Sequence, residues 1–349
     1  MIDAREMATK VILNAAYYSG ASTLASPLLS GCGGILMLHR VTDMNWSPLG
    51  VNSNLTVTPA FLDAVLGDLR RRRIPLVSLD EMLEGVRNGR PRSVVAITAD
   101  DAYLDNFTEA LPVLEAHDAP FTLYVAPALV SGEVEPWWEV LEETVARRDL
   151  VYLPTPQGLV GVECADAEQK RSAFWRLKTY LTEEVAEEDQ QQVLKRIVGP
   201  PGPGEEPPRR FVNWKEVRDL AAHRLVTIGA HTVHHYNLRR VSADTVLREM
   251  TDSARILEIE TGERPRHFAY PYGFAAAVGA REVEIARKAG FASAVTTRHG
   301  VILPRHARHM HALPRISING RYQRLRYVRT LLSGLTTPIA NRGRRLVTV

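Results

Sequence analysis

Two adjacent carboxylates follow an apolar segment of strand length. Asp100 and Asp101 come directly after Ser93-Val94-Val95-Ala96-Ile97-Thr98-Ala99. Strand ends are where α/β folds present reactive groups. Neighbouring residues that leave a strand point in different directions, so one carboxylate can bind a metal ion while the other faces a water molecule. Acidic pairs are also common in surface turns, and for this pair alone that alternative stays open.

A histidine cluster follows a second apolar segment, Leu225 to Ala230, and has the sequence His231-Thr232-Val233-His234-His235. Histidines at positions i and i+4 meet on one side of a helical turn, where two imidazoles can bind one divalent ion. We expect this relation for His231 and His235, with His234 pointing elsewhere. A structural role is the alternative. One aspartate with two histidines, however, leaves coordination positions open for water and substrate, as in hydrolytic metal sites.

The third motif is Phe268-Ala269-Tyr270-Pro271-Tyr272-Gly273, an apolar strand stopped by proline and glycine. Such a turn can bring the main-chain N–H of Tyr272 close to a ligand, as an oxyanion donor must be. An ordinary turn explains the same residues equally well.

Strand-length and helix-period segments alternate along the chain, which predicts βαβ units and a largely parallel sheet. The expected strands are 34–38, 94–98, 121–125, 225–228, 267–270 and 292–296. The expected helices are 59–72, 78–88, 107–117, 214–223, 242–261 and 280–289. In a barrel of this kind, the working residues lie on the loops after the strand carboxyl ends.

The interval from Trp137 to Phe211 breaks this alternation, and we interpret it as a charged, helical insertion. It ends in a Pro- and Gly-rich run at 199–208 that cannot form a helix or central strand, so we expect an exposed loop. The predicted organisation is an N-terminal helical segment at 1–30, a catalytic domain at 31–320 with the insertion at about 140–210, and a basic C-terminal extension at 321–349.

The composition of the 349 residues is that of a globular protein, with 45% hydrophobic and 24% charged residues. Cys32 and Cys164 lie far apart, so any metal must use histidines and carboxylates. No secretory signal and no run of about 18 apolar residues is found, which favours a cytoplasmic protein.

Two features of the chain ends leave membrane contact open. Ile2, Met7, Val11, Ile12 and Tyr18 could line one side of a helix; we favour core packing there, and a membrane-surface helix is the alternative. After Glu284 the chain has 13 Lys or Arg and no acidic residue. We favour a solvated or acid-paired surface for this basic end, because no nucleic-acid module or aromatic stacking pattern accompanies it.

Taken in this order, the three motifs resemble those of the polysaccharide deacetylases of carbohydrate esterase family 4. Thr98-Ala99-Asp100-Asp101 is similar to the family's Thr/Ser-Phe-Asp-Asp, the segment 231–235 matches His-Ser/Thr-x-x-His, and Pro271-Tyr272-Gly273 matches the end of Arg-x-Pro-Tyr-Gly. Three further segments resemble exopolysaccharide-type members: Leu38-His39-Arg40-Val41, Pro136-Trp137-Trp138-Glu139 and Leu313-Pro314-Arg315-Ile316. The resemblance spans about Ile35 to Ile318 and implies a distorted (β/α) barrel with Zn²⁺ or a similar divalent ion such as Co²⁺, Ni²⁺ or Mn²⁺.

The chain departs from the family pattern at four places. Ala99 replaces the usual Phe and Ala102 the usual Gly. Ala269 stands where many members have the Arg that orients the catalytic base, and no Leu-x-His motif supplies the usual general acid. Our candidate replacements are Arg315 for the arginine and His39, which follows the first strand, for the acid. Rival acids are His299, His306, His309 and His311.

The resulting hypothesis is a metal-dependent N-deacetylase of amino sugars in a glycan or glycolipid precursor. Asp101, His231 and His235 would hold the ion, and Asp100 would act as the base. Tyr272 would stabilise the oxyanion and His39 would protonate the amine. The alternatives are an O-acetyl esterase and an inactive glycan-binding module. The expected partner is an acetylated glycan and not nucleic acid; a lipid-linked substrate, membrane contact and the oligomeric state stay open.

Overall fold

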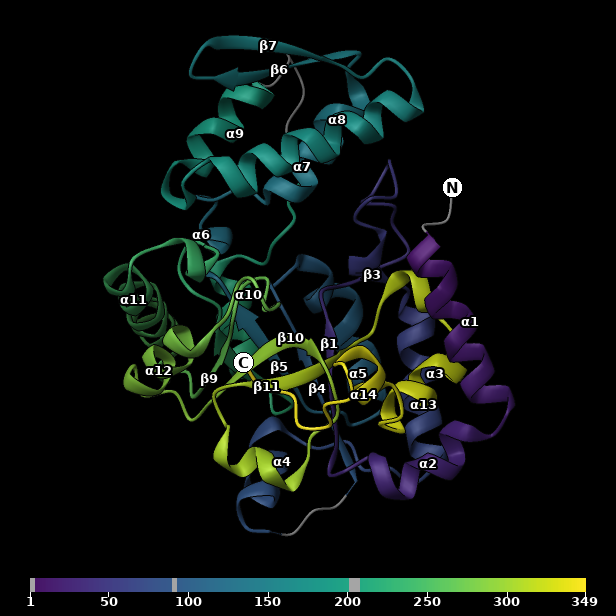
Figure 1. The fold of residues 1–349 in the computed structure, drawn as a ribbon. Coiled ribbons are helices and arrows are strands. Elements are labelled where there is room, and N and C mark those ends of the chain that lie inside the picture. Colours follow the sequence, from purple (N-terminus) through teal and green to yellow (C-terminus); the bar gives the residue numbers. More distant parts are fainter. Residues whose placement is uncertain (1–3, 90–92, 201–207) are drawn as a thin grey trace.

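The computed structural model describes residues 4–89, 93–200 and 208–349. Seven parallel strands within these residues close into a barrel in the order β1-β11-β10-β9-β8-β5-β4 (Figure 1). Their bounds are β1 Gly33–Leu38, β4 Val94–Ala99, β5 Phe121–Val125, β8 Val226–Ala230, β9 His267–Ala269, β10 Ser293–His299 and β11 Leu313–Ser317. The predicted α/β barrel is confirmed, and each of the six expected strands overlaps a barrel strand.

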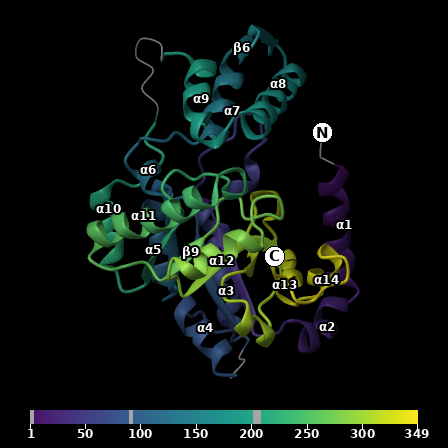
Figure 2. The same ribbon diagram turned by 60° about the vertical axis from the view of Figure 1, so that its left-hand side comes forward.

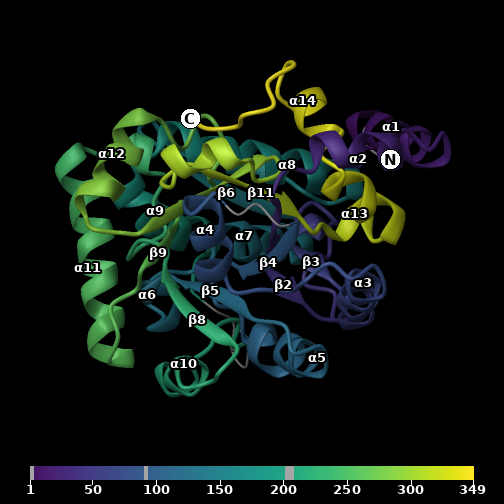
Figure 3. The ribbon, with the colours of Figure 1, turned by 90° about the horizontal axis from the view of Figure 1, so that it is seen from below.

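Helices cover the outside of the barrel, as the view from below shows (Figure 3). They are α3 Pro59–Arg71, α4 Leu79–Arg87, α5 Leu111–Ala116, α10 Trp214–Ala221, α11 Ala243–Thr261, α12 Ala280–Lys288 and α13 Leu325–Leu332. A π-helix, Asn106–Ala110, precedes α5. Side-chain caps fix several helix starts, because a cap satisfies backbone N–H groups that lack a helical partner. Thr58 caps α3, and Ser78 and Asn213 form capping boxes at α4 and α10.

Apolar side chains fill the lower part of the barrel and leave its upper part to polar groups. Ile35, Ala96, Val295 and Leu313 pack in one buried cluster with Met82 and other residues of α4, which covers the amino ends of the strands. Successive strand residues face opposite sides of a sheet. The residues two positions further along the same strands therefore also point into the barrel, closer to its carboxyl end. They are Met37, Thr98, Thr297 and Arg315.

The segment after β5 forms a separate layer over the carboxyl ends of the barrel strands (Figures 1 and 2). It begins at α6 Pro127–Val130 and continues through α7 Trp137–Arg147, β6 Leu150–Thr155, β7 Gly158–Glu163, α8 Ala167–Thr179 and α9 Gln190–Val198. The layer has its own core, in which Trp137, Leu141, Phe174, Leu177 and Leu194 are buried. The insertion is helical, as expected, and it also contains an antiparallel hairpin of β6 and β7 that the sequence analysis did not predict. Residues 201–207 of the expected Pro- and Gly-rich loop lie outside the described residues.

Two buried arginines join this layer to the barrel. Arg40 of the short strand β2 (Arg40–Val41) donates to Glu139 on α7 at 3.0 Å and to Asp105 at 2.8 Å. Arg210 reaches the same Glu139 carboxylate with its Nε at 3.1 Å. A buried carboxylate needs such partners, because an unpaired charge in the interior is costly. The ion pairs therefore fix α7 above the rim, where β2 also pairs with β3 (Thr56–Val57).

The two chain ends pack against each other on one side of the barrel. Helices α1 (Ala4–Tyr18) and α2 (Ala21–Leu29) lie beside α13, and α14 (Thr336–Ala340) follows α13. The favoured core-packing role for the apolar side of α1 is wrong: Met7, Val11, Ile12 and Tyr18 are exposed, and Ile2 lies outside the described residues. Within the described part of the chain, no helix combines the length and apolar character needed to cross a membrane.

Candidate metal and catalytic site

Asp100 and Arg315 form a buried ion pair at the carboxyl end of the barrel. Arg315 Nη1 lies 2.7 Å from Asp100 Oδ1, and Arg315 Nη2 lies 2.6 Å from Asp100 Oδ2. The guanidinium is itself held by the Thr296 carbonyl at 3.0 Å and by the Thr98 hydroxyl at 3.1 Å. This bidentate ion pair fixes both the position and the plane of the Asp100 carboxylate.

The ion pair also keeps Asp100 ionised. Burial by itself raises the pKa of this carboxyl group, but the charge and hydrogen bonds of Arg315 outweigh burial and lower the pKa below its usual value. Asp100 is therefore a carboxylate at neutral pH and can accept a proton. Arg315 reaches Asp100 from β11, whereas Ala269, at the position where the resemblance would place an arginine, lies on β9.

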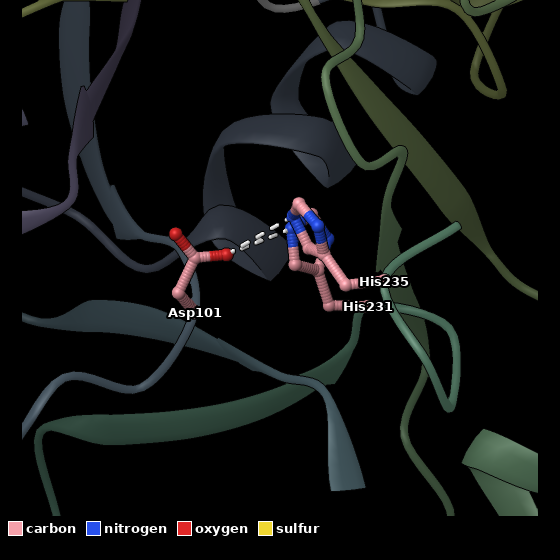
Figure 4. Close-up of side chains that lie close together, drawn as sticks. All are labelled: Asp101, His231 and His235. Carbon is pink, nitrogen blue, oxygen red and sulfur yellow. Dashed lines mark ion pairs between the residues drawn. The ribbon is translucent and has the colours of Figure 1, made fainter. Parts of the chain in front are cut away.

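Asp101, which follows Asp100 in the sequence, converges with His231 and His235 on one point (Figure 4). Asp101 Oδ1 lies 3.4 Å from His231 Nε2 and 3.3 Å from His235 Nε2. Each of the three side chains is less than a tenth exposed. His234 points away and contacts Glu249 Oε1 through its Nδ1 at 2.6 Å, as the sequence analysis expected.

The backbone that carries these ligands is a loop, and the predicted helical turn for His231 and His235 is wrong. Thr232 and His235 have φ angles of 60° and 59°, in the left-handed region. The Thr232 hydroxyl accepts a hydrogen bond from the His235 N–H at 3.0 Å and thereby closes the turn. Asp101 and Ala102 have φ angles of 71° and 58°. Left-handed conformations strain residues other than glycine, and such strain is concentrated at functional sites.

The three ligand residues fit a tetrahedral divalent ion. Asp101 Oδ1 is buried and has no hydrogen-bond partner among the described residues, although two imidazole nitrogens face it. Donor atoms bound about 2.1 Å from a tetrahedral ion lie about 3.4 Å from one another, which agrees with both ligand distances. The Ala269 carbonyl accepts the hydrogen of His231 Nδ1 at 2.7 Å, so the lone pair of Nε2 faces Asp101. An oxygen and two imidazole nitrogens suit zinc and related metals.

Tyr272 lies in the turn after β9, with a φ angle of 62°. Its carbonyl accepts from the Thr297 hydroxyl at 2.6 Å. Among the described residues, no hydrogen bond of the Tyr272 N–H is recorded. Gly273 is required here, because a Cβ at this position would lie 2.5 Å from Thr297 N. The phenol accepts from Trp137 Nε1 at 2.9 Å, and burial raises its pKa. Tyr272 therefore offers a main-chain donor, while its side chain supports α7.

His39 lines the same cavity as Asp100, Asp101 and the two ligand histidines, at the carboxyl end of β1. Its four rivals do not line this cavity. His311 precedes β11 and contacts the Phe291 carbonyl at 2.7 Å, and His306 is buried against the Val347 carbonyl at 3.0 Å. His299 contacts the Thr336 hydroxyl at 2.7 Å. Of the five histidines considered as the acid, only His39 faces the described cavity.

The cavity has a volume of about 300 Å³, and both the barrel and the upper layer line it. Trp137 and Trp138 form part of its wall, and the Trp138 ring centroid lies 5.1 Å from that of His235. The two tryptophans also belong to the core of the upper layer. Trp137 and Trp138 therefore both line the cavity and pack in the core of the upper layer.

Further residues of the cavity wall were missed in the sequence analysis. They are Asn52, Asn54, Leu55, Phe274, Thr297 and Ser317, together with Met37 at the base. The loop before η1 (Ser53–Leu55) is held by the buried Glu142 of α7, which accepts from Ser47 Oγ at 2.7 Å, Leu49 N at 2.8 Å and Asn52 Nδ2 at 2.8 Å. No sequence motif marks this loop, since its place depends on a contact with a residue 90 positions away.

Phe274 is the exposed aromatic residue of the rim, and its replacement gives a test of substrate contact. Stacked aromatic contacts contribute about 0.5–1.5 kcal/mol, so Phe274→Ala should raise KM for an acetylated oligosaccharide about 2- to 10-fold and leave kcat nearly unchanged. Trp175→Ala on α8 is the matched control, because both side chains are 48% exposed and Trp175 lies outside the cavity. Equal KM values in wild type and Phe274→Ala would remove Phe274 from the substrate site.

Comparisons with known proteins agree with this architecture. A family model described as polysaccharide deacetylase matches residues 172–294, which include His231, His235 and Pro271-Tyr272-Gly273. The resemblance to polysaccharide deacetylases is confirmed. The matched region begins after Asp100 and Asp101 and therefore does not include them. For these two residues, the similarity to the family depends on the sequence motif and on their position directly after β4. A search of curated proteins finds no match.

Solved deacetylase structures share the fold. Streptococcus pyogenes deacetylase PplD in complex with acetate has 20% identity and a TM-score of 0.51, and the alignment covers 82% of this chain and 92% of that one. IcaB from Ammonifex degensii has 18% identity, a TM-score of 0.53 and coverage of 86% and 97%. BC0361, a polysaccharide deacetylase from Bacillus cereus, has 17% identity, a TM-score of 0.52 and coverage of 85% and 68%. The barrel is thus of the polysaccharide deacetylase type.

Proposed function

We propose that the protein is a metal-dependent hydrolase that removes acetyl groups from N-acetylated amino sugars of a polysaccharide, oligosaccharide or glycolipid precursor. One observation carries this proposal: three convergent ligands, Asp101, His231 and His235, adjoin an ionised Asp100 in one cavity. An inactive glycan-binding module would have no need of a buried base. The match to the polysaccharide deacetylase model supports the glycan as substrate.

Asp101, His231 and His235 would hold Zn²⁺ or a similar divalent ion such as Co²⁺, Ni²⁺ or Mn²⁺. When bound, such an ion polarises a carbonyl group and lowers the pKa of water. Asp100 accepts the proton of the attacking water, and Arg315 acts as a positioning residue that keeps the carboxylate ionised and correctly oriented. The free N–H of Tyr272 donates to the oxygen on which negative charge develops. His39 delivers a proton to the departing amine.

The acid role of His39 gives a test in which the leaving group is varied. We expect His39→Ala to keep normal metal content and to lose about 10²-fold in turnover of an acetamide, because an amide nitrogen leaves poorly without a proton. On an activated acetyl ester, whose leaving group needs no proton, the His39→Ala variant should lose much less turnover. His311→Ala, which changes a histidine outside the cavity, should match wild type on both substrates.

Similar losses on the acetamide and the activated ester would place the general acid elsewhere. Metal content measured on the same samples separates this outcome from a damaged metal site.

Acetate release tests the proposed activity itself. The wild-type chain is assayed on N-acetylated chito-oligosaccharides and on an O-acetylated glycan, before and after treatment with a chelator. Release from the N-acetyl substrate that stops with chelator supports the proposal. Release from the O-acetyl substrate alone would make the protein an esterase, and no release from either substrate after metal addition would favour a glycan-binding module.

A further inference from the structure

The N-terminal helical hairpin, α1 with α2, exposes large apolar side chains to solvent. Met7, Val11, Ile12 and Tyr18 on α1 are 49%, 59%, 45% and 73% exposed. Leu24 and Leu28 on α2 are 79% and 76% exposed. A surface helix normally turns its apolar stripe toward the core and its charged residues toward water. The hairpin has the reverse arrangement, with an apolar outer face that the fold does not use.

The inner face of the hairpin is bound by specific contacts. Leu13 is buried. Asn14 Oδ1 accepts from Arg326 Nε at 2.7 Å, and the Tyr17 hydroxyl accepts from Arg329 Nη1 at 3.1 Å. These contacts dock α1 on α13 through its polar side. The apolar outer face is therefore held outward by the docking and is not exposed by loose packing.

After Lys10, the sequence of the hairpin carries no charged residue. Between Lys10 and Arg40 the chain contains no Asp, Glu, Lys or Arg. Exposed helices of soluble proteins normally carry charged residues on the solvent side, and contiguous exposed apolar patches mark interaction sites. A helical segment with an uncharged, apolar outer face is suited to lie in the boundary between water and lipid.

Positive charge borders this apolar face on both sides. Arg345 Nη2 donates to the Leu28 carbonyl at 2.6 Å, and Arg342 and Arg344 next to it are exposed. On the α13 side, Arg324 is exposed, and the guanidinium of Arg326 lies 5.8 Å from the Tyr18 ring centroid. The view from below shows α13 and the C-terminal segment beside α1 and α2 (Figure 3). No acidic residue follows Glu284 to neutralise these arginines from the same segment.

We propose that this hairpin docks on an anionic phospholipid bilayer, lying in the plane of the interface. Its membrane-docking face is defined by the apolar residues Met7, Val11, Ile12, Tyr18, Leu24 and Leu28 and the bordering arginines Arg342, Arg344 and Arg345. The apolar side chains enter the headgroup boundary, and the arginines contact lipid phosphates. A second copy of the chain fits this face less well, because a symmetric contact would bring the same arginines together across the interface.

Vesicle flotation with the full chain tests the proposal. Wild type should bind vesicles of phosphatidylcholine with about one third phosphatidylglycerol, bind pure phosphatidylcholine more weakly, and lose binding as salt is raised. The double variant Val11→Asp, Leu28→Asp should lower the partition coefficient about tenfold or more, because two charges enter the apolar contact. The double variant Arg342→Gln, Arg344→Gln should lose the preference for anionic vesicles.

Ile259→Asp on α11 is the matched control. Ile259 is 69% exposed, and its helix α11 lies on the opposite side of the barrel from α1 and α2 (Figure 1), so this variant should bind as wild type does. Sedimentation analysis of the same variants reports self-association. Absence of wild-type binding to anionic vesicles, equal binding by Val11→Asp, Leu28→Asp, or a wild-type dimer that this variant abolishes would each overturn the proposal. Because the experiment measures vesicle binding, its result is independent of the proposed deacetylase activity.

Discussion

The Asp100→Asn variant should retain its metal ion and lose roughly 10³-fold in the rate of acetate release. The amide has nearly the shape of the carboxylate, so the cavity keeps its form. It cannot accept a proton at neutral pH, however, and one of its two polar atoms is a donor that faces a donor of Arg315. In this variant, turnover should therefore fall while the metal content stays at the wild-type level.

Asp101→Asn is the matched comparison for this experiment. The two aspartates are adjacent and both less than a tenth exposed, but only Asp101 faces His231 and His235. We expect Asp101→Asn to lose both metal retention and turnover. Wild-type turnover in Asp100→Asn would exclude Asp100 as the base, and loss of metal from Asp100→Asn would mean that its carboxylate is a ligand.

The double variant His231→Ala, His235→Ala should retain no metal and should fall at least about 10³-fold in acetate release. Each substitution removes one imidazole donor, and the remaining Asp101 alone binds a divalent ion weakly. His234→Ala is the control within the same segment, because His234 contacts Glu249 and not the ligand cluster. It should retain wild-type metal content. One metal ion per chain in the double variant would show that the metal lies elsewhere.

Much of the barrel could be predicted from the sequence, because six of its strands are continuous apolar runs between helix-period segments. The strand β11 could not be predicted in this way. Pro314 and Arg315 interrupt its apolar pattern, and the buried charge of Arg315 is neutralised by Asp100, which directly follows β4. A long-range pair of this kind leaves no periodic signal in either strand.

The sequence singles out Asp101, His231 and His235, which the structure brings together as a candidate metal site, but it does not predict their local geometry. The spacing of His231 and His235 is compatible with a helical turn, but left-handed residues at Thr232 and His235 shape the segment into a loop. The rest of the cavity wall depends on contacts between distant segments. Asn52 reaches the rim because Glu142 on α7 binds it, and Trp137 is placed by its hydrogen bond with Tyr272. Such contacts become visible only when the upper layer is folded onto the barrel.

Titration of metal into stripped protein tests the central claim most directly. The wild-type chain is treated with a chelator, dialysed and mixed with increasing Zn²⁺, and acetate release from an N-acetylated chito-oligosaccharide is followed at each step. A single site formed by Asp101, His231 and His235 predicts that the rate rises from background and reaches its maximum at one ion per chain, with no rise in the double histidine variant. Equal acetate release by the stripped and the metal-loaded chain, or a rise that persists in the double variant, would contradict this account.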